Sequence, residues 1–165
     1  MKCCVIIFLL CVIFQATPLY ASGRSESRAY TLEQATTEAM RRISLRINSG
    51  SLAVINILSS NANTSLQITR WLETGLSQRG KFEIVTRQQI NMVMAEQNFG
   101  MSGYVDDNSA QRIGYFLGTQ YILLGELINV ENENILNIQV LEVETARIIF
   151  SENFRIKNRF RQRRF

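Results

Sequence analysis

The segment from Glu96 to Asp107, EQNFGMSGYVDD, contains the residues whose types and spacing come nearest to a chemical site. Its Gly-Met-Ser-Gly run, residues 100–103, superficially resembles a nucleophile elbow. That motif needs G-x-S-x-G on a strand-to-helix turn together with a histidine base, and the chain contains no histidine. We therefore interpret the two glycines as residues that permit positive φ in a connection between two helices.

Asp106 and Asp107 are adjacent carboxylates that could bind calcium or serve as an acid and a base. The D-x-D-x-D-G series of a calcium loop does not accompany them. We favour the interpretation that one of them caps the helix that follows and the other is solvated. A hydrolase that acts through this pair stays open as an alternative.

The composition excludes most enzyme classes. All three cysteines lie in the first 21 residues, and histidine is absent throughout. Zinc sites of the usual kind and Ser-His or Cys-His nucleophiles therefore have no ligands or bases. The sequence predicts a protein that is not an enzyme and that has no cofactor and no metal.

The first 21 residues have the layout of a secretory signal peptide, with Met1-Lys2, an apolar run over 3–14 and a polar stretch that ends at Ala21. The run is too short to span a bilayer, for which about 20 apolar residues are needed. A lipoprotein signal would need a small residue before Cys11, which follows Leu10 instead. We expect cleavage near Ala21 and a periplasmic protein, with association with the outer membrane as a further option.

The basic character of the chain is concentrated at its end. Of the 18 Lys and Arg residues, Lys2 is in the leader and six lie in residues 155–165. The remaining 11 face 14 acidic residues, so residues 22–154 carry a net charge of −3. This basic C-terminal tail could contact anionic lipid or an acidic protein surface, whereas nucleic acid is not expected for an exported protein.

The hydrophobic pattern predicts one α/β (α+β) domain over 29–154, with residues 22–28 as a flexible leader. Helices are expected over 32–46, 66–79, from 86 onwards and over 108–118, and strands over 52–58, 81–85, 120–129, 135–143 and 147–154. The order is α-β-α-β-α-α-β-β-β. It predicts a single mixed β-sheet of about five strands with helices packed on it, a parallel first pair and an antiparallel hairpin near the end.

Local signals place the ends of these elements. Thr31 to Gln34 and Thr86 to Gln89 match capping boxes, and Asn108 is expected to cap the last helix. Residues 48–50 are expected to close the first helix, and Gly80 and Gly118 the second and the last. Gly114 is expected to allow close packing of a helix on the sheet.

The order of motifs resembles the family of bacterial envelope proteins grouped around CsgG, the curli secretion component, to whose broader group the penicillin-binding-protein activator LpoB also belongs. The residues that carry the likeness are VINILSS, GKFEIVTRQQI, EQNFGMSGYVDDNSAQRIG, LGTQYILLGEL and VETA, between Ser51 and Ser151. In that family the EQxF…SGxVDD segment is a structural connection, so the resemblance implies no catalytic residue. Two features depart from the family pattern: Thr86 replaces a frequent Asp, and the lipidated cysteine is absent.

The resemblance implies two different functions. One is an exported accessory protein that binds a partner protein in cell-wall or surface assembly. The other is a component of a curli or surface-fibre secretion complex, which as a pore subunit would need long additional hairpins that the short connections do not provide. The envelope partner is expected at residues Met101, Tyr104, Asp106, Asp107, Arg159, Arg161, Arg163 and Arg164. A homo-oligomer and a peripheral contact of the tail with an anionic membrane are further options.

Overall fold

The computed structural model describes residues 29–96 and 106–157. Its elements follow the predicted order: α1 (Leu32–Arg46), β1 (Gly50–Ser59), α2 (Ala62–Ser77), β2 (Phe82–Ile84), α3 (Arg87–Glu96), α4 (Asp107–Leu117), β3 (Tyr121–Val130), β4 (Glu133–Glu142) and β5 (Arg147–Ile156). The predicted fold class is therefore confirmed.

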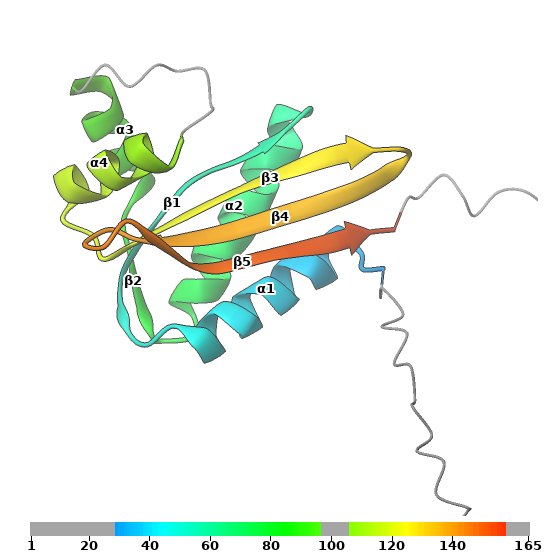
Figure 1. Ribbon diagram of the computed structural model, residues 1–165, viewed down its shortest axis with the longest axis horizontal. Helices are drawn as coiled ribbons and strands as arrows, with labels where there is room; N and C mark the ends of the chain where they lie inside the picture. The colour runs from blue at the N-terminus through cyan, green and yellow to red at the C-terminus, as the bar shows by residue number, and fades with distance from the viewer. Residues whose placement is uncertain (1–28, 97–105, 158–165) are drawn as a thin grey trace, which may run out of the picture.

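The five strands form one sheet in the order β2-β1-β3-β4-β5 (Figure 1). Strand β1 lies between β2 and β3 and pairs in parallel with both. The last three strands form an antiparallel meander. Both the parallel first pair and the antiparallel hairpin that the sequence predicts are thus confirmed.

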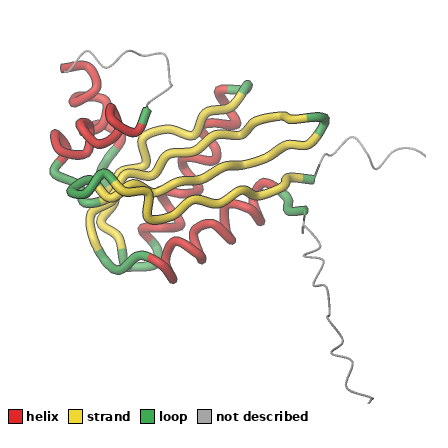
Figure 2. The backbone as a smooth tube through the Cα atoms, in the orientation of Figure 1, coloured by secondary structure: helices red, strands yellow, loops and turns green. Residues whose placement is uncertain are grey.

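The helices cover the two faces of this sheet unequally (Figures 1 and 2). Helices α1 and α2 pack along one face, where the larger core contains residues such as Ile43, Leu72, Ile138 and Phe150. Helices α3 and α4 cover only one end of the opposite face, and the second, smaller core lies beneath them. The rest of that face is not covered by any described element.

Local sequence signals explain several ends of these helices. Thr31 and Gln34 form the predicted capping box, with the Thr31 N–H donating to Gln34 Oε1 at 3.0 Å and the Gln34 N–H to Thr31 Oγ1 at 3.2 Å. Thr86 and Gln89 form the second one at 3.2 and 3.3 Å. Gly118 ends α4 at φ 64°, in the left-handed region where glycine has no steric penalty.

Other helix ends differ from the prediction. Helix α1 ends through Ile47, which is extended, so that Gly50 already belongs to β1. Helix α2 begins earlier than expected because the Asn61 side chain accepts from two backbone N–H groups. It also ends at Ser77 with Gln78 as cap, while Gly80, at φ 68°, lies in the turn beyond. Helix α3 begins at Arg87, directly after Thr86 of the predicted capping box, and no end was predicted for it.

The strands of the meander extend further than predicted at the β3–β4 turn and at the end of β5. Glu131 and Asn132, both at positive φ, form a two-residue turn, so β3 and β4 pair from Val130 and Glu133 onwards. Strand β5 continues through Ile156, two residues into the predicted tail. Ile156 also forms a parallel bridge with Tyr30, which extends the ladder at this point.

Candidate functional site

The structure places only two of the predicted partner-binding residues. Asp106 caps α4, because its Oδ1 accepts a hydrogen bond from the Ser109 N–H at 2.7 Å. That bond holds the pKa of the Asp106 carboxyl below its usual value. Asp107 is exposed in the first turn of α4. The capping interpretation is confirmed with Asp106 as the cap, and the assignment of the cap to Asn108 was wrong.

The other predicted residues lie outside the described part of the chain. Met101 and Tyr104 fall within 97–105, and the four tail arginines within 158–165 (Arg159, Arg161, Arg163 and Arg164). Their place on a partner-binding surface stays a prediction. The segment 97–105 leads directly into α4, so the exposed surface of that helix is adjacent to it in the chain.

Helix α4 presents two large aromatic side chains to solvent. Tyr115 is 59% exposed and Phe116 52% exposed. A groove of about 320 Å³ lies between the end of this helix and the ends of β3 and β4, lined by Gly114, Tyr115, Gly118, Thr119, Gln120, Tyr121, Glu142, Val143 and Glu144. The Tyr115 hydroxyl donates to the Glu144 carbonyl at 3.4 Å at the groove. We call this groove, with Phe116, the α4 groove.

A close approach of helix and sheet holds the α4 groove in place. A Cβ on Gly114 would lie 2.4 Å from Cγ2 of Val143, so only glycine fits without a shift of its neighbours. The Gln111 side chain donates from Nε2 to the Val143 carbonyl at 3.0 Å. The predicted packing role of Gly114 is therefore confirmed, and Tyr115 is fixed beside the sheet.

The uncovered part of the sheet forms a second surface, which we call the open sheet face. Its residues alternate with those that pack under α1 and α2, and the register aligns them in rows across the strands: Leu124, Gln139 and Ser151; Leu58, Glu126, Asn137 and Asn153; Ile128, Ile135 and Arg155; Val130 and Glu133. Figure 1 looks onto this face, with α2 visible behind β3 and β4.

Polar side chains on the open sheet face are partly paired with each other. Asn137 Nδ2 donates to Asn153 Oδ1 at 2.9 Å across β4 and β5. Arg155 Nε lies 3.6 Å from Glu133 Oε2. Ile128 nevertheless remains 38% exposed, so the end of this face near the β3–β4 turn is apolar as well as charged.

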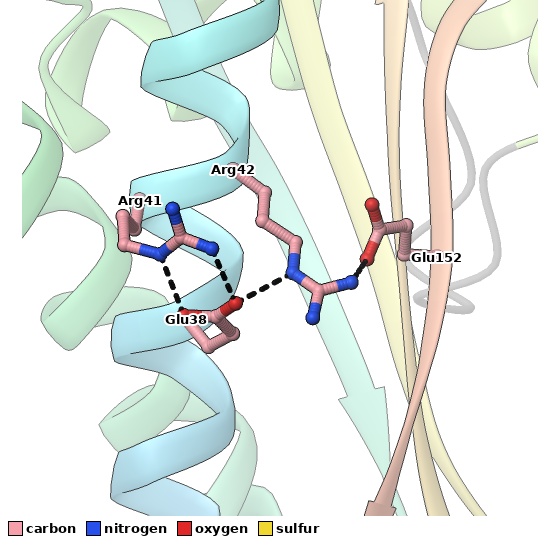
Figure 3. Close-up of polar contacts among 4 residues, drawn as sticks. All are labelled: Glu38, Arg41, Arg42 and Glu152. Carbon is pink, nitrogen blue, oxygen red and sulfur yellow. Dashed lines mark hydrogen bonds and ion pairs between the residues drawn. The ribbon is translucent and has the colours of Figure 1, made fainter. Parts of the chain in front are cut away.

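An ion-pair cluster joins α1 to β5 on the helix-covered side (Figure 3). Arg42 contacts Glu38 from Nε at 2.7 Å and Glu152 from Nη1 at 2.5 Å. Arg41 contacts Glu38 through Nε at 2.8 Å and Nη2 at 2.7 Å. The Arg42 guanidinium also lies over the Phe154 ring, 5.6 Å from its centroid. This cluster fixes α1 against the edge strand.

The electrostatics of this cluster follow from its geometry. Hydrogen bonds from Arg41 and then Arg42 lower the pKa of Glu38 to about 2. The same carboxylate raises the pKa of both arginines. Glu38, Arg41 and Arg42 are therefore charged at neutral pH, and their ion pairs hold α1 against β5.

The described residues show neither a metal-binding group nor a membrane-spanning helix. No cluster of three or more Asp, Glu, His or Cys side chains within 29–96 and 106–157 could hold a metal ion. No helix in the same ranges is long and apolar enough to cross a bilayer. Two surfaces of the described residues on which recognition could take place are the α4 groove and the open sheet face.

Residues 26–135, more than half of the chain, match the family model described as "Curli production assembly/transport component CsgG". The chain belongs to the CsgG family. The resemblance seen in the sequence is thus confirmed, and the match begins before Val54, where the first quoted motif starts.

This CsgG family member is similar in sequence to several proteins of known name. "Penicillin-binding protein activator LpoB" of Dickeya dadantii is 30% identical over 110 residues, which cover 63% of this chain and 55% of that protein. The protein of the same name from Klebsiella pneumoniae is 30% identical over 111 residues, 64% of this chain and 51% of its own length. The chain therefore spans about half the length of these curated relatives.

Solved structures give the same fold. The LpoB C-terminal domain from Escherichia coli matches with a TM-score of 0.66 at 20% identity, covering 78% of this chain and 100% of that domain. The NMR structure of E. coli LpoB matches with a TM-score of 0.57 at 25% identity, covering 78% of this chain and 68% of that protein. The arrangement of helices and strands is thus that of a known domain.

Sequence reasoning missed both surfaces. No role was assigned to Tyr115 and Phe116 from the sequence, although both lie outside the buried stripe of their helix, where side chains face solvent. The alternation of apolar and polar residues in β4, such as Ile138 and Gln139, already indicates a strand with one polar face. What covers each face depends on the path of the chain, which the pattern does not contain.

Proposed function

We propose that this protein is an exported, non-enzymatic accessory protein that binds and activates a penicillin-binding protein in the bacterial envelope. The observation that carries this proposal is the 30% identity to curated relatives named penicillin-binding protein activator LpoB. The shared domain fold supports it. So does the composition, because a chain without histidine, and without cysteine after residue 21, lacks the usual nucleophiles and bases.

The α4 groove is the surface we assign to this partner. Tyrosine and other aromatics at the centre of a concave patch are the side chains that most often dominate the binding energy of an interface. Tyr115 and Phe116 are exposed aromatics on a helix that Gly114 and Gln111 hold against the sheet. Such preorganised aromatics bind a partner with little loss of conformational entropy.

Binding to purified penicillin-binding proteins from the same organism tests the proposal. The protein from Ser22 onwards should bind at least one of them and raise its rate of glycan polymerisation or crosslinking. Tyr115→Ala and Phe116→Ala should each weaken binding by about tenfold or more, the loss expected for an interface residue that contributes about 1.4 kcal/mol or more. Thermal unfolding should change little, since both side chains are more than half exposed.

Leu45→Ala is the matched control, because Leu45 is 72% exposed on α1, away from the groove. It should leave binding unchanged. Activation that survives both aromatic substitutions would remove the α4 groove from the proposal. Failure to bind or stimulate any penicillin-binding protein would remove the function itself.

A role in curli or surface-fibre secretion is the second candidate, favoured by the description of the family model. The two functions differ in what the protein assembles into. A secretion component should copurify with membrane as a ring-sized particle, and its deletion should abolish surface fibres. An activator should instead be recovered with its synthase and should leave fibres intact.

Location and assembly state belong to the same proposal. We infer that residues 1–21 are removed as a signal peptide and that the domain acts in the periplasm. Fractionation of cells, with the N-terminus of the recovered protein sequenced, checks both the location and the cleavage near Ala21. Sedimentation of the purified chain measures whether it forms a homo-oligomer, and release by salt measures whether it contacts the outer membrane peripherally.

A further inference from the structure

The end of the open sheet face near the β3–β4 turn has exposed apolar side chains. Ile128 is 38% exposed and Val130 is 45% exposed. Ile135 lies half-buried directly opposite Ile128 on β4. Each of these residues is β-branched and projects from a regular ladder, so the χ1 angles of the patch are restricted.

Acidic side chains surround this apolar patch. Glu126 is half-buried on the face, opposite Asn137, and Glu133 lies beyond Ile135. Glu131 is exposed in the turn itself. Arg155 is the basic residue on these rows, 3.6 Å from Glu133. Among the ion pairs of residues 29–96 and 106–157, none engages Glu126.

The chain itself leads a complementary segment to this place. Strand β5 pairs Arg155 with Ile135 and Ile156 with Asn134, so Lys157 follows at the same end of the sheet as the β3–β4 turn. The next eight residues, 158–165, read NRFRQRRF and contain four arginines, two phenylalanines and no acid. Their charge is opposite to that of the patch, and their aromatic rings suit its apolar centre.

The length of this segment suffices to cross the face. Eight extended residues span about 26 Å at about 3.3 Å per residue. The distance from β5 across β4 and β3 to β1 is three strand spacings, or about 14 Å. A segment tethered at Lys157 also has a high effective concentration at a site so close to its attachment.

We propose that residues 158–165 bind the open sheet face of their own domain. The arginines lie against Glu126, Glu131 and Glu133, and the two phenylalanine rings lie against Ile128 and Val130. The tail then covers the part of the sheet that α3 and α4 leave exposed. This contact does not depend on whether a penicillin-binding protein binds the α4 groove.

Methyl NMR of two chains tests the contact. One chain runs from Ser22 to Phe165 and the other from Ser22 to Lys157. Ring currents and charge from the bound tail should shift the methyl signals of Ile128, Val130 and Ile135 between the two chains. Leu45 and Leu66, exposed on α1 and α2, should give the same signals in both.

Charge variants separate a specific contact from a general one. In the full chain, Glu126→Gln together with Glu133→Gln should move these signals towards those of the shorter chain, because two of the three carboxylates are lost. Glu83→Gln, which removes an exposed carboxylate on β2 at the other edge of the sheet, should not. High salt should act like the double substitution.

Three results would overturn the proposal. Identical methyl signals in the two chains would show that the tail does not reach the face. A difference that disappears on dilution would show that the tail binds a second copy. If phosphatidylglycerol vesicles bind only the longer chain while the two chains give the same signals, the tail is a membrane contact instead.

Discussion

The two faces of the sheet differ in burial and polarity, and strand β4 shows this difference most directly. Leu136, Ile138 and Val140 point under α1 and α2 and are fully buried. The residues between them, Asn137 and Gln139, point to the opposite face and are only partly buried. One strand thus provides both the centre of the core and a polar, hydrogen-bonded exterior.

The two faces of the sheet contribute differently to stability and to recognition. On the covered face, burial of apolar surface drives folding. On the open sheet face, pairs such as Asn137 with Asn153 satisfy polar groups while leaving the surface accessible. The apolar side chains that remain there, such as Ile128, add little to the core and are available for contact.

The largest expected contrast is between two isoleucines of neighbouring strands. Ile138→Ala should destabilise the fold by about 2–5 kcal/mol, because it leaves a cavity at a fully buried site. Ile128→Ala should cost less than about 1 kcal/mol, since the side chain is partly in water already. Urea denaturation of both variants measures this difference. Equal losses would show that the open sheet face is part of the core.

Gly114→Ala tests the close packing of α4 on the sheet, at the end that α3 and α4 cover. The added Cβ would meet Val143 at 2.4 Å and Ile122 at 3.2 Å, so we expect a loss of about 1–3 kcal/mol. Adding Val143→Ala should recover part of it by making room. The midpoint of thermal unfolding reports both effects, and an unchanged midpoint for the single variant would contradict the close packing of α4.

Asp106→Ala tests whether this residue acts through the helix or through a partner. Loss of the cap should destabilise the protein by about 1 kcal/mol. Asp106→Asn should retain most of the stability, because an Asn side chain also caps, and Asp107→Ala should change it little. A binding defect in Asp106→Asn without a loss of stability would restore Asp106 to the partner-binding surface.

The smallest effect is the pH dependence of the ion-pair cluster at the edge of the covered face. Because the pKa of Glu38 is lowered from 4.5 to about 2, its stabilisation is present above pH 4.5 and is lost as the pH falls towards 2. Glu38→Gln should therefore be less stable than the parent at pH 7, by about 1 kcal/mol or less given partial exposure. The gap should close near pH 2, and denaturant titrations at both pH values measure it.

The sequence predicts the elements of this fold better than their surfaces. Capping boxes at Thr31 and Thr86 are local signals that depend on four residues, and both were correct. The sequence predicted either one of the Asp106–Asp107 pair or Asn108 as the cap of α4, because adjacent polar residues are equally good caps, and Asp106 is the cap in the structure. Which residue caps α4 depends on where the helix packs on the sheet, and the local sequence does not contain that information.

The candidate surfaces depend on long-range placement. The α4 groove joins Tyr115 to Glu144, which are 29 residues apart, and no local pattern brings them together. The open sheet face follows from the short reach of α3 and α4 over the sheet. Most of the predicted contact residues lie in 97–105 and 158–165, and their role in binding a partner stays a prediction.

The position of β1 between β2 and β3 has a consequence for the order of folding. Its partner β3 follows far along the chain, as the contact of Ser51 with Gln120 across 69 residues shows, whereas β3, β4 and β5 are joined by two short turns. We expect the meander to form first and β1 to join late, because closing the longer loop has the larger entropic cost. A chain that stops at Gly118 lacks the whole meander and should show no cooperative unfolding.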